Sequence, residues 1–100
     1  MYYAIYCEDR EDSFERRRSV RPAHLQRLDL LNKEGRLLLA GPLLNEDNEN
    51  PVMGGVKGSL IVAEFKSLSA AKEWAAADPF VTADVYQRVT VCPFKKVLPL

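Results

Sequence analysis

The sequence predicts an α+β fold in which four strands and two helices follow one another in the order βαββαβ. Three observations lead to this expectation. Apolar runs of strand length recur four times, a leucine repeat with helical spacing follows the first run, and an alanine-rich segment follows the third. Hydrophobic residues make up 47% of the 100 residues and charged residues 28%, which is ordinary globular composition. We therefore expect a single domain, residues 1–100, with a hydrophobic core of its own.

The first predicted strand covers residues 2–7. Its sequence, Tyr-Tyr-Ala-Ile-Tyr-Cys, is apolar and aromatic throughout and is followed by two acids, so we expect it at the centre of the sheet. Residues 11–21 are densely charged. From Glu8 to Arg21, five arginines are balanced by five acids, which favours a solvated helical turn or loop over a phosphate-binding site.

The clearest helix is predicted from Arg21 to Glu34. Pro22 suits a first-turn position, leucines follow at helical spacing, and Gly35 is a typical stop. A second helix is expected over residues 68–77, because a serine precedes it as a cap and an Asp-Pro pair closes it.

Three further strands are predicted over residues 37–42, 59–65 and 86–94. The first of these ends at Pro42, because proline cannot donate a hydrogen bond to the neighbouring strand. Residues 44–57, which connect it to the next strand, are rich in asparagine, glycine and acids. We expect this connection to be a long mobile loop.

This order of elements, with a long central hairpin loop, is typical of a ferredoxin-like split-βαβ sandwich with the strand order 4-1-3-2. Both helices then cover the same face of the sheet. The first and third strands are nevertheless apolar at nearly every position, so the second face also requires cover. A second copy of the chain can supply it, and we expect a homodimer whose sheets pack face to face.

Composition narrows the classes of partner and location. Fourteen basic residues balance fourteen acidic ones, so the chain lacks the positive charge expected of a protein that binds nucleic acid or an anionic membrane. No apolar stretch reaches the ~18 residues of a membrane span, and no leader precedes the first strand. We expect a cytoplasmic protein.

The chain has too few metal donors for a zinc site, since it contains two cysteines, Cys7 and Cys92, and one histidine. Both thiols are expected to be reduced and buried.

The predicted topology brings together His24 and Asp78, which are 54 positions apart. A right-handed crossover makes the two helices antiparallel, so the first turn of one and the last turn of the other share one end of the sheet. At 100° per residue, His24 falls on the leucine face and its imidazole points toward the sheet. Asp78 falls on the inner face of the second helix, where a carboxylate needs a partner.

A histidine paired with a carboxylate suits acid–base chemistry. Asp78 would orient the imidazole and stabilise its protonated form, while His24 moves a substrate proton. The alternative is structural: Asp78 caps the backbone before Pro79, and His24 is a satisfied, partly buried side chain near a helix N-terminus. The residues alone leave both interpretations open.

Four more residues are expected at the same end of the sheet as substrate-binding candidates. They are Gly41 and Pro42, where the second strand ends, Ser59, where the third begins, and Arg21, beside the histidine. Ser59 is a candidate nucleophile, but no elbow motif surrounds it. Arg21 can bind an anionic substrate group, pair with Asp78, or be an ordinary surface residue.

Several short motifs occur in the order found in the YciI-like (YCII-related) family, which the chain resembles over nearly its whole length. They are Arg21-Pro-Ala-His24-Leu-Gln-Arg-Leu, Glu34-Gly-Arg-Leu-Leu-Leu-Ala-Gly-Pro42, Gly58-Ser59, Ser67-Leu-Ser-Ala-Ala-Lys-Glu-Trp-Ala, Asp78-Pro-Phe80 and Val91-Cys-Pro-Phe-Lys95. Each motif is unspecific by itself, whereas their collinear succession is fairly specific.

The resemblance implies a dimeric α/β-barrel protein with an active site centred on a histidine and an aspartate, roles that carry over to His24 and Asp78. A family member in chloroaromatic degradation is a dehydrochlorinase that eliminates HCl from a ring, which is acid–base chemistry without a cofactor. Two functions stay open. One is a cofactor-independent, lyase-like or hydrolase-like enzyme acting on a small organic molecule, and the other is a non-catalytic dimeric module that binds a small ligand or a partner.

Overall fold

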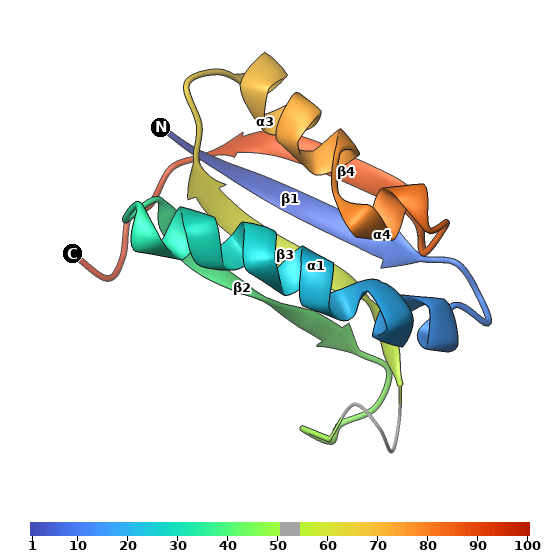
Figure 1. Cartoon of the computed structure of the whole chain (residues 1–100). Helices are drawn as coiled ribbons and strands as arrows, with labels where there is room; N and C mark the ends of the chain where they lie inside the picture. Colours follow the sequence, from blue (N-terminus) through green and yellow to red (C-terminus); the bar gives the residue numbers. More distant parts are fainter. Residues whose placement is uncertain (51–54) are drawn as a thin grey trace.

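The computed structural model of the chain describes residues 1–50 and 55–100. Its four-stranded sheet has the order β2-β3-β1-β4, and every neighbouring pair is antiparallel. This confirms the predicted ferredoxin-like fold, the strand order and the central position of the first strand (Figure 1). The elements are β1 (Tyr2–Asp9), α1 (Phe14–Lys33), β2 (Leu37–Leu44), β3 (Val56–Glu64), α3 (Leu68–Ala76), α4 (Pro79–Thr82) and β4 (Tyr86–Phe94).

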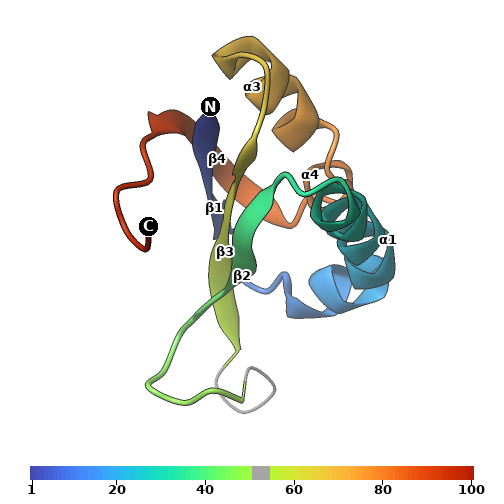
Figure 2. The same cartoon turned by 90° about the vertical axis from the view of Figure 1, so that its left-hand side faces the viewer.

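The helices cover only one face of the sheet, as Figure 2 shows in edge-on view. The core lies between that face and the helices. Alternate residues of β1, including Ile5 and Cys7, point into it and meet Leu28 and Leu31 of α1 and Phe80 of α4. The single helical layer follows from the connections, because both crossovers are right-handed and return on the same side.

Helix α1 begins at Phe14, seven residues before the predicted start, so most of residues 11–21, expected as a helical turn or loop, belong to the main helix. Pro22 lies inside the helix rather than in its first turn. An interior proline removes one backbone hydrogen bond and crowds the preceding turn. Contacts between the first turns of the helix and the sheet offset this cost: Arg17 is 7% exposed and donates a hydrogen bond to the carbonyl oxygen of Gly58.

The second crossover holds two helices instead of one. Ser67 caps α3 as expected, since its Oγ accepts a hydrogen bond from the backbone N–H of Ala70. Asp78, however, does not close α3. It is the N-cap of the short helix α4, and its Oδ1 accepts from the backbone N–H of Phe80 at 2.9 Å.

The two strands of the central hairpin are longer than expected, and the loop that connects them is shorter. Strand β2 continues through Pro42 to Leu44, which is possible because β2 is an edge strand and its free side needs no donor. Strand β3 already begins at Val56. The predicted mobile loop is thus reduced at both ends, and its residues 51–54 lie outside the described residues.

The two cysteines differ in environment, so the expectation that both are buried is wrong for one of them. Cys7 is buried and Cys92 is exposed. Cys92 pairs with Ala4 across the β1–β4 ladder and lies on the face of the sheet that carries no helix. Burial raises the pKa of the Cys7 thiol to about 12, which makes it an inert core residue.

At Gly58 the backbones of β1 and β3 lie too close together to leave room for a side chain, because a Cβ atom there would overlap the carbonyl oxygen of Cys7. We expect Gly58→Ala to lower the free energy of unfolding by about 2 kcal/mol or more, since the two central strands must move apart. Gly41→Ala is the matched control: a Cβ at Gly41 meets no described atom within 4 Å. Urea unfolding followed by circular dichroism measures both, and equal stabilities would contradict the assigned close approach.

Candidate functional site

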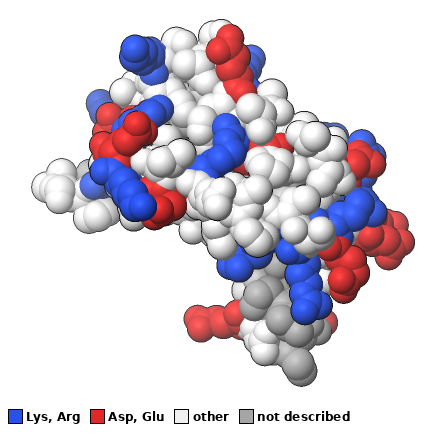
Figure 3. Space-filling view, in the orientation of Figure 1, with Lys and Arg blue, Asp and Glu red and all other residues white. Residues whose placement is uncertain are grey.

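A cavity of about 550 Å³ lies between α1 and the β2–β3 hairpin. Its walls are mostly apolar, and five polar side chains line it: Arg17, Arg18, Arg21, His24 and Ser59. Among the described lining residues there is no aspartate or glutamate. The wall therefore carries positive charge without a carboxylate, although basic and acidic side chains are mixed over the helical surface around it (Figure 3).

His24 and Asp78 form a buried pair, as their positions on the predicted helices indicated. The Nδ1 atom of His24 lies 2.8 Å from Oδ2 and 3.0 Å from Oδ1 of Asp78, and the two residues are 6% and 1% exposed. Asp78 also caps α4, so the structural and the paired interpretations of this residue both hold. His24 lies in the middle of α1 rather than in its first turn, because the helix starts earlier than expected.

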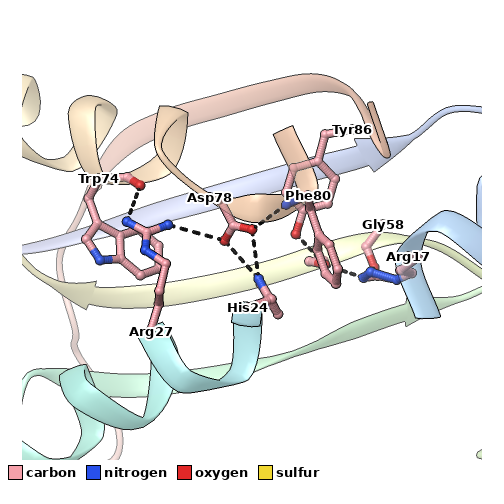
Figure 4. A network of polar contacts seen from close by, with 9 residues as sticks. Arg17, His24, Arg27, Gly58, Trp74, Asp78, Phe80 and Tyr86 are labelled. Carbon is pink, nitrogen blue, oxygen red and sulfur yellow. Dashed lines mark hydrogen bonds and ion pairs between the residues drawn. The ribbon is translucent and has the colours of Figure 1, made fainter. Parts of the chain in front are cut away.

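The pairing determines which imidazole nitrogen is available. A carboxylate only accepts hydrogen bonds, so Nδ1 carries the proton and its N–H donates a hydrogen bond to Asp78. Hydrogen bonds from the described residues reach His24 only at Nδ1, and the residue lines the cavity. Phe80 stacks on the imidazole at 4.1 Å between ring centroids and 18° between planes. The ring is thus held by Asp78 and Phe80, as Figure 4 shows for its contacts with Asp78, and this tautomer leaves Nε2 without a proton.

Arg27 is the cation that approaches Asp78 from the other side. Its Nη1 lies 3.7 Å from Oδ2 of Asp78, while Nη2 donates to the carbonyl oxygen of Trp74 at 2.7 Å. Burial lowers the pKa of Arg27, and the charge of Asp78 partly offsets that effect. One of the roles considered for Arg21, an ion pair with Asp78, is not formed: the ion-pair partners of Asp78 among the described residues are His24 and Arg27. Arg21 is instead an exposed residue at the cavity wall.

A second polar cluster surrounds Ser59. Arg17 Nη2 donates to Ser59 Oγ and to the carbonyl oxygen of Gly58, and the Tyr86 hydroxyl donates to Ser59 Oγ at 2.9 Å. Burial raises the pKa of Tyr86 well above its ordinary value, so this hydroxyl stays neutral and donates. Both groups on Ser59 are donors, and neither is a base that could activate it as a nucleophile.

Asp9 lies behind this cluster and balances Arg17 incompletely. Its Oδ2 is 3.6 Å from Arg17 Nε, and among the described residues neither oxygen of Asp9 has a hydrogen-bond partner. Burial raises the pKa of Asp9, while the charge of Arg17 lowers it. Arg17 Nη1 is also buried, without a hydrogen-bond partner in the described part of the chain.

The cavity brings together most of the residues selected from the sequence. His24, Arg21, Gly41, Pro42 and Ser59 all line it, and Asp78 lies behind His24. Arg17 and Phe80 were missed. A signal for Arg17 existed, since residues 17, 21, 24 and 28 recur on one face of a helix, but it appears only once the helix is extended back to residue 14.

Metal ligands do not cluster in the described parts of the chain: no group of three or more histidine, cysteine, aspartate or glutamate side chains is placed to hold an ion. The helices within residues 1–50 and 55–100 are also too short or too polar to cross a membrane.

Comparisons with known proteins agree with the architecture. Protein YciI of Escherichia coli O6:H1 is 58% identical over 97 residues, 97% of this chain and 99% of that protein. An uncharacterized protein of Haemophilus influenzae is 52% identical with the same coverage. The structure of 5-chloro-2-hydroxyhydroquinone dehydrochlorinase (TftG) from Burkholderia phenoliruptrix, in complex with 2,5-dihydroxybenzoquinone, superposes with a TM-score of 0.84 at 26% identity and covers 95% of this chain and 94% of that one.

The YCII-related domain model matches residues 1–95. This match and the level of identity to YciI confirm the family that the sequence motifs indicated. The chain belongs to the YCII-related family.

Proposed function

We propose that this protein is a cofactor-independent small-molecule enzyme in which His24 and Asp78 carry out acid–base chemistry on a small organic compound. One observation carries the proposal: the buried 2.8 Å contact fixes Nδ1 of His24 on Asp78 and leaves Nε2 for a molecule in the cavity. A general base needs this arrangement, since an oriented neutral imidazole can take a proton and its carboxylate partner stabilises the cation that forms.

The cavity favours a ring-shaped substrate. Its apolar walls include Leu25, Leu28 and Ile61, and the face of Phe80 already stacks on His24. An aromatic or quinonoid ring buries its faces against such walls, while its polar substituents meet the few convergent polar groups. The bound 2,5-dihydroxybenzoquinone of the dehydrochlorinase structure is a compound of this class and supports the proposal.

Elimination of HCl is the reaction class we infer. The ring reacts as a keto tautomer whose chlorine-bearing carbon is tetrahedral. A substrate proton moves to Nε2 of His24, the electron pair is held as an enolate on a ring oxygen, and the enolate then forms a new π bond as chloride leaves with the electrons of the C–Cl bond. The step is redox-neutral, so it requires neither an oxidant nor a reductant. Asp78 compensates the positive charge on His24 until the proton is released to solvent.

We expect His24→Gln to lower the rate of chloride release by at least about 100-fold, because the proton acceptor is removed. Asp78→Asn should lower it by at least about tenfold, because the amide no longer compensates the imidazolium charge. Chloride release from 5-chloro-2-hydroxyhydroquinone and related chlorinated hydroquinones measures both effects. Asp29→Asn is the matched control, since Asp29 is exposed on α1 and forms an ion pair with Lys33.

Thermal unfolding of each variant shows whether the fold is retained. Undiminished turnover by His24→Gln would contradict the proposed role. Ligands that raise the melting temperature of the wild type and of His24→Gln alike, with no turnover by either, would instead favour the non-catalytic binding module.

We also propose that the protein is a homodimer whose sheets pack face to face. The helix-free face exposes Tyr6, Leu39 and Phe94, with exposed fractions of 42%, 46% and 39%. Their ladder partners Thr90, Val62 and Tyr2 share this face, while its charged residues, the Glu8–Arg88 ion pair and Glu64, lie at the two ends of β1. An apolar sheet face of this kind gains free energy when a second copy covers it.

We expect the wild type to sediment at micromolar concentration with twice the 11.3 kDa mass of the chain. Tyr6→Glu should shift the equilibrium to monomer, because it buries a charge at the centre of the interface. Leu30→Glu is the control, since Leu30 is 62% exposed on α1, away from that face. A monomeric wild type, or a Tyr6→Glu variant that stays dimeric, would overturn this assembly.

A further inference from the structure

We propose that Arg17 and Ser59 form a subsite that binds a negatively charged ring oxygen, a phenolate or enolate, of the substrate. The inference deepens the proposed function and rests on it for the reaction, whereas the binding of the oxyanion can be measured separately. Neither residue is needed as acid or base. Their role is to hold the end of the ring opposite the proton that His24 removes.

The first argument is that both residues keep a hydrogen-bond donor that no described residue accepts. The Arg17 side chain is 8% exposed, and its Nη1 is buried without a hydrogen-bond partner among the described residues. Ser59 Oγ accepts from Arg17 and from Tyr86, so its own hydrogen is left to donate. Both Arg17 and Ser59 line the cavity. An anionic oxygen in the cavity would accept the Ser59 hydrogen, and the guanidinium that contacts Ser59 would attract it through its charge.

The second argument is charge. Arg17 carries a guanidinium, and its ion pair with Asp9 is long, with Nε 3.6 Å from Oδ2. Neither Asp9 oxygen has a hydrogen-bond partner among the described residues, so this loose contact neutralises the guanidinium incompletely. Arg18 and Arg21 also line the cavity, but both are exposed and solvent screens their charge, so the buried Arg17 is the cation that decides. The electrostatic environment therefore favours an anion, and a low local dielectric strengthens that attraction.

The third argument is spacing. His24 and Arg17 contact the same Phe80 ring: the imidazole stacks on it at 4.1 Å, and the guanidinium carbon lies 4.6 Å from its centroid. Figure 4 shows Phe80 between the two side chains. The two polar ends of the site are thus held apart by the Phe80 ring that both of them contact. A six-membered ring with substituents at opposite positions can reach both.

This geometry gives the subsite a catalytic consequence. When His24 removes a proton from one side of the ring, the electron pair delocalises toward the oxygen on the other side. Donors placed at that oxygen stabilise the charge as it develops, which is how oxyanion-binding groups accelerate reactions. The ligand class is accordingly a hydroxylated aromatic or hydroxyquinone with an ionisable oxygen.

Isothermal titration calorimetry with two probes tests the inference. 2,5-Dihydroxybenzoquinone has ionisable oxygens, and its dimethyl ether has none. Loss of one hydrogen bond to a charged oxygen weakens binding by roughly tenfold or more, so we expect that effect for Ser59→Ala and a larger one for Arg17→Gln. Arg17→Lys should be intermediate, because it keeps the charge but loses the planar fork. The ether should bind weakly and equally to all variants.

Arg18→Gln is the matched control, since Arg18 lines the same cavity but is exposed; we expect less than about a threefold change, as exposed charges are screened. Equal affinity of wild type, Ser59→Ala and Arg17→Lys for the dihydroxy compound would overturn the subsite. An effect of Arg18→Gln as large as that of Arg17→Gln would do so too, because attraction would then be non-specific. Should Arg17→Gln fail to fold, Ser59→Ala and Arg17→Lys decide the matter.

The variant His24→Gln separates the two proposals. It should bind the dihydroxy compound within a few-fold of wild type and show no turnover. Retained turnover in His24→Gln, with binding still lost in Ser59→Ala, would refute the proposed base and leave the oxyanion subsite supported.

Discussion

The carboxylate of Asp78 is the group on which the rest of the structure depends. A carboxylate that is 1% exposed is stable only when its oxygens are satisfied. Three groups from two helices do this: the imidazole of His24 and, at a longer distance, the guanidinium of Arg27 on α1, and the backbone N–H of Phe80 at the start of α4. The same contacts start α4, attach it to α1 and orient the proposed base. The fold and the candidate site therefore share their polar interactions.

Much of this arrangement could be predicted from the sequence, because the signals are periodic and local. The strands are apolar runs, Ser67 is a recognisable cap, and angular spacing along a helix places His24 inward. The start of α1 was not predictable in the same way. Its first two turns are charged, and what makes them helical is the burial of Arg17 against the carbonyl of Gly58, 41 positions away. Helix α4 has four residues, too few for a periodic signal, so Asp78 was placed in the wrong element although its partner was right.

Local segregation of charge is hidden by the neutrality of the whole chain. Fourteen basic and fourteen acidic residues cancel in total, yet the described cavity wall has arginines and no acid. The acids of the charged segment before and within α1 lie outside the cavity wall. Asp9 is behind Arg17, Glu8 pairs with Arg88, and Glu11, Asp12 and Glu15 are exposed. Neutral composition argues against a polyanion as partner, but it leaves room for a small anionic ligand in an arginine-lined cavity.

Phe80 has a consequence for how members of this family can diverge. It is 1% exposed and belongs to the hydrophobic core, yet it also touches both His24 and Arg17. A change of ring size at this position would alter the distance between the two ends of the cavity and would at the same time leave a void or a clash in the core. Selectivity for substrate length is thus tied to thermodynamic stability. New specificities can arise at this position only in backgrounds stable enough to tolerate the repacking.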